Sequence, residues 1–231
     1  MYHTVVIGGG CLGAAAAISI QRKLNNLGNK DKVCLVEKAV LCAAESSRHS
    51  GIVRSANADP DASVMASIST KMWKDLSAVW GIKMELDEFG AIWIAKKNSD
   101  GENPAWADLS DRMKKIDLTF EEIDTSSATE KCGKTLLTDK NESYFYEPGA
   151  FQLDPSILRS TLYDAIDHNG VELMEKTEVD TILTKGNQIL GITTNNGKID
   201  AKNFVNATGA WSSQLFSKIG LKIPVTIEPV S

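Results

Sequence analysis

The chain opens with an alternation of apolar and small residues that is typical of a nucleotide-binding unit. Residues 3–7 are rich in β-branched side chains and run directly into a cluster of glycines, after which residues 14–20 are small or apolar. A second apolar run, residues 32–37, ends in an acid. This order predicts a strand, a tight turn, a helix and a second parallel strand, joined by a right-handed crossover. The first 37 residues therefore predict a Rossmann-like βαβ unit.

The rest of the chain predicts two kinds of architecture. Apolar spacings of three and four predict a helix over residues 61–80, with further helices over 104–116 and 154–168. Strands are expected over 89–95, 118–123, 144–146 and 171–174, and residues 204–211 are expected to form a strand that runs into a turn. Residues 178–185 and 188–194 alternate around Gly186-Asn187 as a hairpin. Strands and helices do not alternate regularly between 82 and 150. We predict a discontinuous α/β domain over residues 1–81 and 151–231, with residues 82–150 as an inserted α+β part of a substrate-binding domain.

Composition narrows the class of protein. The 231 residues are 42% hydrophobic and 24% charged, which is ordinary for a globular chain, and the net charge of −5 provides no basic surface for nucleic acid. The longest apolar run, residues 14–20, is far shorter than the roughly 20 residues that cross a bilayer, and we expect a cytoplasmic protein without a membrane span. Three scattered histidines and four cysteines without a CxxC pair predict no metal site.

The three spaced glycines of the first turn each have a physical reason. Gly8 permits the sharp turn, Gly10 lets a pyrophosphate approach the backbone, and Gly13 allows the helix to pack closely on the strand. The helix N-terminus that carries Cys11 and Leu12 favours an anion. Glu37, at the tip of the second strand, is placed to accept hydrogen bonds from a ribose 2′-OH and would repel a 2′-phosphate, so NADP is disfavoured. The unit is predicted to bind the ADP half of a dinucleotide.

An ordered set of motifs makes the chain similar to a known family almost from end to end. These motifs are Val5-Val-Ile-Gly-Gly-Gly-Cys-Leu-Gly13, Ser46-Ser-Arg-His-Ser-Gly51, Asp154-Pro155 before a helix, Thr177-Glu-Val-Asp-Thr-Ile182 and Asn206-Ala-Thr-Gly-Ala-Trp211. They resemble the FAD-dependent amine oxidoreductases (DAO family), which include D-amino-acid oxidase, glycine oxidase and sarcosine oxidase. The resemblance implies FAD as cofactor, bound by a glutathione-reductase-type βαβ fold.

The resemblance also assigns cofactor-binding residues beyond the glycine turn and Glu37. Ser46, Ser47, Arg48 and Gly51 would lie along the pyrophosphate and the edge of the flavin ring, and Val179 would meet the adenine through its backbone. The full set implied is Gly8, Gly10, Cys11, Leu12, Gly13, Glu37, Lys38, Ser46, Ser47, Arg48, His49, Ser50, Gly51, Val179, Ala207, Thr208, Gly209 and Trp211.

Two residues are candidates for a role close to the reaction. Arg54 matches the position at which monomeric sarcosine oxidases hold the substrate carboxylate, and a guanidinium fork suits that partner. The alternative is an arginine that tethers a loop. For His49 we favour a histidine that hydrogen-bonds near the cofactor over one that links the flavin covalently.

The resemblance implies oxidation of the C–N bond of an amino acid or N-methyl amino acid, with hydride transfer to flavin N5. No general base is required if the amine binds in its neutral form. Family members continue past residues 227–231, so we expect a C-terminally incomplete chain: a fragment in the favoured interpretation, otherwise part of a split enzyme completed by a second chain, or a degenerate binder. The rival functions are a 2-hydroxy-acid dehydrogenase of the same fold, a non-catalytic FAD-binding subunit and, third, an NAD-dependent Rossmann enzyme.

Overall fold

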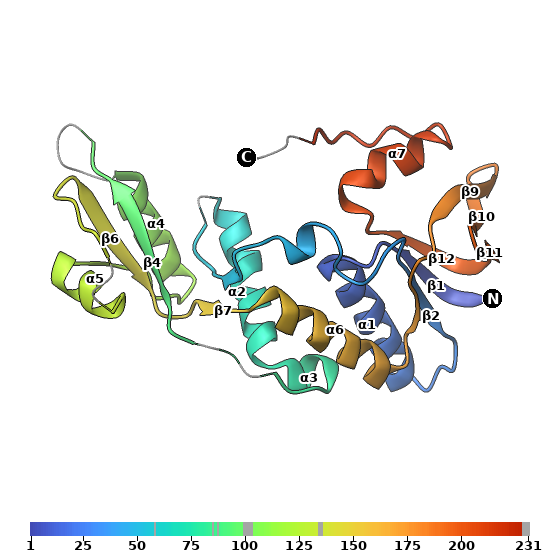
Figure 1. The fold of residues 1–231 in the computed structure, drawn as a ribbon, viewed down its shortest axis with the longest axis horizontal. Coiled ribbons are helices and arrows are strands. Elements are labelled where there is room, and N and C mark those ends of the chain that lie inside the picture. The colour runs from blue at the N-terminus through green and yellow to red at the C-terminus, as the bar shows by residue number, and fades with distance from the viewer. Residues whose placement is uncertain (58, 85, 87, 99–103, 134–135, 228–231) are drawn as a thin grey trace. The chain divides into compact units, whose positions relative to one another are not determined.

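A computed structural model describes residues 1–57, 59–84, 86, 88–98, 104–133 and 136–227 (Figure 1). The chain forms two compact units, each built from separate stretches of sequence. The first unit contains residues 1–49, 77–83 and 155–231, and the second contains residues 50–76 and 84–154.

A four-stranded parallel sheet organises the first unit (Figure 1). Its strand order is β12-β1-β2-β8, with β1 at Tyr2–Ile7, β2 at Val33–Val36, β8 at Glu172–Met174 and β12 at Ala201–Asn206. Helix α1 (Cys11–Asn26) connects β1 to β2, and helix α6 (Pro155–Asn169) precedes β8 and packs beside α1. This is the predicted βαβ unit, extended by one strand on each side.

Both faces of the parallel sheet are covered, which explains its nearly continuous apolar strands. Ala14, Ala17 and Ile18 of α1 are fully buried, and the two small alanines allow that helix to lie close to one face. The other face packs through Val5 and its neighbours against the sheet of β9 (Val179–Lys185), β10 (Gln188–Thr194) and β11 (Gly197–Ile199), and against α7 (Ser212–Ser217). The hairpin predicted around Gly186 is therefore present, as β9 and β10 pair antiparallel.

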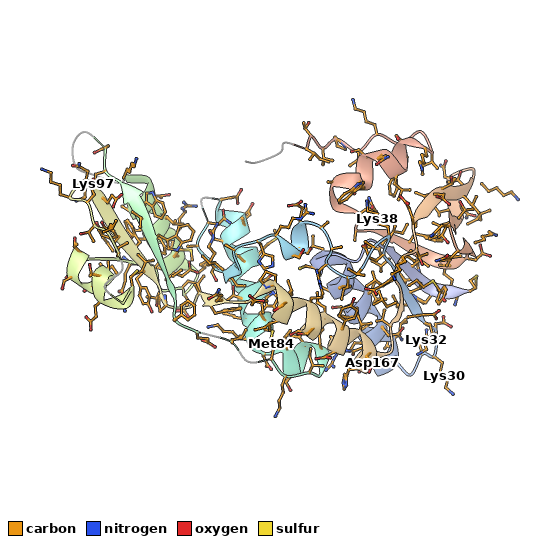
Figure 2. All side chains as sticks on the ribbon, viewed as in Figure 1. Lys30, Lys32, Lys38, Met84, Lys97 and Asp167 are labelled. Carbon is orange, nitrogen blue, oxygen red and sulfur yellow. The ribbon has the colours of Figure 1, made fainter. Side chains whose placement is uncertain are left out.

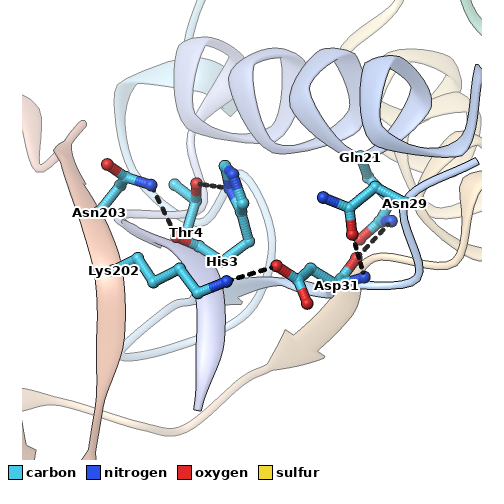
Figure 3. A network of polar contacts seen from close by, with 7 residues as sticks. All are labelled: His3, Thr4, Gln21, Asn29, Asp31, Lys202 and Asn203. Carbon is cyan, nitrogen blue, oxygen red and sulfur yellow. Dashed lines mark hydrogen bonds and ion pairs between the residues drawn. The ribbon is translucent and has the colours of Figure 1, made fainter. Parts of the chain in front are cut away.

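A polar network joins the strands at the edge where they begin (Figure 3). Lys202 Nζ lies 2.7 Å from Asp31 Oδ2, and Asn203 donates to the carbonyl of His3 at 2.9 Å. The side chain of Gln21, which is 1% exposed, accepts from Val33 N at 2.7 Å and donates to the carbonyl of Asp31 at 3.2 Å. The network fixes the edge of the sheet opposite the glycine turn.

The second unit is built on an antiparallel sheet. The strand order is β4-β6-β5, with β4 at Ala91–Lys96, β6 at Glu142–Glu147 and β5 at Glu121–Ile123. Helix α4 (Pro104–Lys115) packs an aromatic core against it, and α5 (Thr125–Lys131) begins at the cap residue Asp124. Strand β3 (Ile52–Val53) pairs with β7 (Phe151–Gln152), and α2 (Pro60–Lys74) follows β3.

Three of the differences from the sequence predictions concern the helices and the division into units. The helix predicted over 61–80 is divided at Asp75 into α2 and α3 (Leu76–Trp80), and the short helix α5 was not predicted. Residues 50–76, predicted to lie with the nucleotide-binding domain, fall in the second unit. The reason is that β3 pairs with β7 and the amides of Ser55 and Ala56 bond to Glu147. No helix among the described residues is long and apolar enough to cross a bilayer.

Candidate cofactor-binding site

The turn between β1 and α1 is too tightly packed for side chains at two of its glycines. Gly8 has a φ of 107°, and a Cβ there would lie 2.4 Å from the carbonyl oxygen of Ala207. A Cβ on Gly13 would lie 1.9 Å from the carbonyl oxygen of Gly8. Both contacts are with backbone, which cannot move aside, so these glycines hold strand, turn and helix in direct contact. A Cβ on Gly10 would meet only the hydroxyl of Ser46, at 3.1 Å.

The N-terminus of α1 offers amide hydrogens, and no Asp or Glu lies in its first turn. Gly10 is the cap residue, in extended conformation, without a side-chain cap. The amide of Cys11 donates to Ser46 Oγ at 3.0 Å. For the amides of Leu12 and Gly13 no hydrogen bond is recorded to any part of the chain that the structure describes. Together with the helix dipole, worth about 0.3–1 kcal/mol for an anion, they form a turn that can accommodate a phosphate group.

Glu37 is fixed beside this turn by main-chain amides. Its Oε2 accepts from Gly9 N at 2.7 Å and its Oε1 from Ala39 N at 2.8 Å. A carboxylate has about four acceptor positions, so two remain for a sugar hydroxyl. The predicted ribose acceptor therefore stands at the tip of β2 with its orientation already set.

A cavity of about 270 Å³ lies at the carboxyl edge of the parallel sheet, close to the size range of small-ligand sites. Most of the predicted cofactor residues line it, namely Gly8, Gly10, Cys11, Leu12, Glu37, Lys38, Ser46, Val179, Ala207, Thr208, Gly209 and Trp211. Sequence reasoning did not select its remaining lining residues, namely Ile7, Val36, Ala44, Glu45, Thr177, Glu178, Ala210, Gln214, Leu215 and Lys218. Thr177 and Glu178 belong to a motif that the sequence analysis identified, and this motif could have indicated them. No sequence motif marks Gln214, which lies on α7, or Lys218, which follows it.

Six predicted cofactor residues do not line this cavity. Gly13 lies beneath the turn, while Ser47, Arg48 and His49 follow in the 3₁₀ turn Glu45–Ser47 and the residues after it. Ser50 and Gly51 belong to the second unit, where the carbonyl of Gly51 accepts from Leu153 N at 2.7 Å. Contact of these residues with a cofactor stays a prediction.

Lys38 and Trp211 form a cation–π pair on the wall of the cavity. Lys38 Nζ, whose residue is labelled in Figure 2, lies 3.8 Å from the centroid of the Trp211 ring. Such a pair contributes about 0.5–1 kcal/mol at an exposed site. It joins the end of β2 to the turn after β12.

Cys11 has an unusually acidic thiol for a residue without a metal. A hydrogen bond from the Cys42 side chain is the main cause and the Ser46 side chain adds to it, so that the pKa of Cys11 falls to about 6 despite partial burial. The same bond and burial raise the pKa of the Cys42 thiol. Cys42 is 1% exposed, and its amide donates to the carbonyl of Gly9 at 2.8 Å, which holds it against the glycine turn.

Arg54, the predicted carboxylate anchor, lies in the second unit just after β3. Its Nη1 donates to the carbonyl of Ala56 at 2.6 Å, and its guanidinium carbon lies 4.3 Å from the centroid of Trp93. The residue is exposed to solvent. The loop-tethering interpretation and the substrate-binding interpretation are therefore compatible, because one guanidinium carries five N–H groups.

Comparison with known proteins places the chain in a family. Residues 3–231 match the sequence profile of DAO, described as FAD dependent oxidoreductase. The chain belongs to the DAO family of FAD-dependent oxidoreductases. The recognised family, the Rossmann-like fold and the cofactor FAD predicted from the motifs are thereby confirmed. The glycine turn, the amides of α1 and the carboxylate of Glu37 fit the ADP half of FAD.

The relatives are distant and longer. The chain is 25% identical to the mitochondrial pyruvate dehydrogenase phosphatase regulatory subunit of Mus musculus, over 92% of this chain and 23% of that protein. It is 21% identical to sarcosine oxidase subunit beta of Rhizobium meliloti, over 97% of this chain and 53% of that protein. L-proline dehydrogenase from P. horikoshii has 25% identity and a TM-score of 0.82, over 99% of this chain and 58% of that one. The chain thus spans about a quarter to somewhat over half of these proteins.

Proposed function

We propose that this chain is the FAD-binding part of an oxidoreductase that oxidises the C–N bond of an amino acid or N-methyl amino acid. The observation that carries the proposal is the cavity around the glycine turn, which gathers twelve of the predicted cofactor residues in a chain of the DAO family. The substrate class is supported by the names of three relatives: sarcosine oxidase subunit beta, 4-methylaminobutanoate oxidase from Paenarthrobacter nicotinovorans and L-proline dehydrogenase.

The residues of the chain divide the work of holding FAD. The amides of Leu12 and Gly13, with Ser46 nearby, would hold the pyrophosphate. Glu37 would accept from a ribose hydroxyl, and the backbone at Val179 would contact the adenine. When bound, FAD supplies a two-electron acceptor for the hydride that leaves the carbon next to the amine. The protein's own contribution is to orient the amine and exclude water.

Arg54 is the residue that we assign to the substrate. Its exposed guanidinium presents a planar fork that matches a carboxylate in two parallel hydrogen bonds. This assigns it a role in binding the amino-acid carboxylate rather than in proton transfer. With a neutral amine, the oxidation requires no general base from the chain.

Anaerobic titration of the FAD-loaded protein, purified together with any further segment or chain that completes it, tests the proposal. Sarcosine, glycine or L-proline should bleach the oxidised flavin band, and methylamine, which lacks a carboxylate, should not. Bleaching by 2-hydroxyglutarate alone would instead assign a 2-hydroxy-acid dehydrogenase. A purified chain that takes up no FAD would remove the basis of the proposal.

A second function is favoured by one relative. The pyruvate dehydrogenase phosphatase relative matches 92% of this chain, and its name describes a regulatory subunit and not an oxidase or dehydrogenase. On that alternative the chain binds FAD without turning over an amine. Firm FAD binding with no bleaching by any amine or hydroxy acid would select it.

We also propose that a further segment or a second chain completes the catalytic protein, and that the reaction takes place in the cytoplasm. The first part is supported by the 58% share of L-proline dehydrogenase that the chain covers and by the relative named as a sarcosine oxidase subunit. Affinity purification of the tagged chain from its native cells, followed by mass spectrometry and cell fractionation, tests both parts. Recovery of the 231-residue chain alone and fully active would contradict the first.

A further inference from the structure

Two groups hold the guanidinium of Arg54 in place within the second unit. The carbonyl of Ala56 accepts from Nη1 at 2.6 Å, and the face of Trp93 lies 4.3 Å from the guanidinium carbon. The electrostatic attraction between a cation and a tryptophan face favours this position, and the hydrogen bond to the carbonyl restricts the rotation of the fork. The direction of the remaining N–H groups therefore depends on where Ala56 and Trp93 are fixed.

One buried carboxylate fixes both of these groups. Glu147, at the end of β6, is 2% exposed. Its Oε1 accepts from Ala56 N at 3.2 Å and from Ser55 N at 2.5 Å, and its Oε2 accepts from Trp93 Nε1 at 3.1 Å. Glu147 thus bonds to the same residue that accepts from Arg54 and to the same ring that stacks on it.

The aromatic core gives the ring a rigid backing. The Trp93 ring lies edge-on to Trp106 at 5.5 Å and to Phe120 at 6.0 Å, and both of these stack with Phe145. Aromatic contacts of this kind stabilise the core beyond the burial of their surface. The hydrogen bond to Glu147 selects the orientation of the ring within this core.

We infer that Glu147 is a positioning residue for substrate binding, which sets the fork of Arg54 through Trp93 and Ala56. The inference rests on the proposed function of Arg54 as the anchor of the substrate carboxylate. Two parallel N–H···O bonds require the fork to be aligned with the carboxylate plane, and alignment comes from residues whose own positions are fixed. A buried carboxylate with a merely structural role would stabilise the unit without affecting carboxylate affinity.

The first experiment reads the ring directly and involves no substrate. The chain is labelled with 5-fluorotryptophan, and the Trp93 resonance is assigned by its loss in Trp93→Phe. Glu147→Gln places an amide N–H opposite the indole N–H or the backbone amides, so the Trp93 resonance should shift. Arg54→Lys should shift it also, because the planar cation leaves the ring face. Glu122→Gln, an exposed glutamate on β5 of the same sheet, is the matched control and should leave it unchanged.

The second experiment measures carboxylate binding to the FAD-loaded chain by calorimetry, with benzoate as probe and benzamide as its neutral counterpart. Arg54→Lys and Glu147→Gln should each weaken benzoate binding about tenfold, which corresponds to about 1.4 kcal/mol. The double variant should be no weaker than Arg54→Lys, because both changes act on one contact. Affinities for benzamide and FAD should stay unchanged, as should every affinity in Glu122→Gln.

The outcomes separate the inference from the proposal beneath it. Benzoate binding that is weakened by Arg54→Lys and untouched by Glu147→Gln overturns the positioning role and leaves the proposed function standing. Benzoate binding that Arg54→Lys does not change removes Arg54 as anchor, and the positioning role with it. Additive losses in the double variant also overturn the inference. If Glu147→Gln does not fold, Trp93→Phe, which keeps an aromatic face and deletes the bond to Glu147, takes its place in the calorimetry with the same expected loss of benzoate affinity.

Discussion

Single glycines in the first turn have different roles, and substitution can separate them. Gly10→Ala adds a methyl group that meets only the hydroxyl of Ser46 at 3.1 Å, so we expect the free energy of unfolding to change by no more than about 0.5 kcal/mol. Gly10 lines the cavity, so if the turn holds the pyrophosphate the added methyl group should lower FAD affinity at least tenfold. Denaturant titration and fluorescence titration with FAD measure the two quantities.

Alanine substitutions at two other glycines, Gly13 and Gly149, supply the comparison for Gly10→Ala. Gly13→Ala places a methyl group 1.9 Å from the carbonyl oxygen of Gly8, and overpacking of this kind costs about 1–3 kcal/mol in unfolding free energy. Gly149→Ala, which would meet nothing within 4 Å, should change neither stability nor FAD affinity. Unchanged FAD affinity in Gly10→Ala would contradict the phosphate-binding role of the turn.

The thiol of Cys11 gives a prediction in pH. With a pKa of about 6, held down mainly by the hydrogen bond from Cys42, Cys11 is largely thiolate at pH 7, whereas an ordinary thiol with a pKa of about 8.5 is not. Alkylation by iodoacetamide, followed by mass spectrometry at Cys11, should reach half its maximal rate near pH 6. The Cys42→Ala variant should move this midpoint upward, and bound FAD should slow the reaction because Cys11 lines the cavity. A midpoint near 8.5 in the unmodified chain would contradict the assignment.

Among the elements, helix α2 is one where the periodic pattern correctly predicts a helix but wrongly predicts which of its faces is buried. Spacings of three and four among Met65, Ile68 and Met72 predict an apolar stripe turned toward the core, yet these residues are 67%, 55% and 44% exposed. The opposite face is buried instead, through Ser67 at 8% and Thr70 at 6% exposure. Periodicity identifies a helix, but which face is covered depends on the neighbours that tertiary packing brings to it.

Substitutions on the two faces of α2 test this orientation. Thr70 Oγ1 accepts from Ser55 Oγ at 3.2 Å, so Thr70→Val leaves a buried hydroxyl without its acceptor and should destabilise the protein by about 1–3 kcal/mol. Ile68→Ala, on the exposed face, should change the free energy of unfolding by less than about 0.5 kcal/mol. Thermal and denaturant unfolding measure both. The reverse order of the two effects would show that the apolar face is the buried one.

At the scale of the whole molecule, part of the site is predictable from residues close together in the sequence, and the rest depends on contacts between residues far apart in the sequence. The glycine turn and Glu37 were predictable because the turn, the helix start and the acid lie within 37 residues and follow the geometry of one βαβ unit. Lys218, which lines the cavity and donates to the carbonyl of Asp180 at 2.7 Å, was not, because only the packing of α7 on β9 brings it there. Likewise Arg54 was found by its motif, while Glu147 lies 93 residues later and its role depends on the pairing of β4 with β6.

The two compact units predict how a bound dinucleotide redistributes stability. Every residue that lines the cavity belongs to the first unit, so FAD at a hundred times its Kd should stabilise that unit by about 2.7 kcal/mol. In hydrogen exchange, added protection should concentrate in β1, the start of α1 and the segment around Val179. ADP should protect the same amides because it carries the pyrophosphate and ribose, whereas NADP should protect them weakly because Glu37 repels a 2′-phosphate. Protection by ADP confined to the antiparallel sheet of the second unit would move the nucleotide site away from the glycine turn.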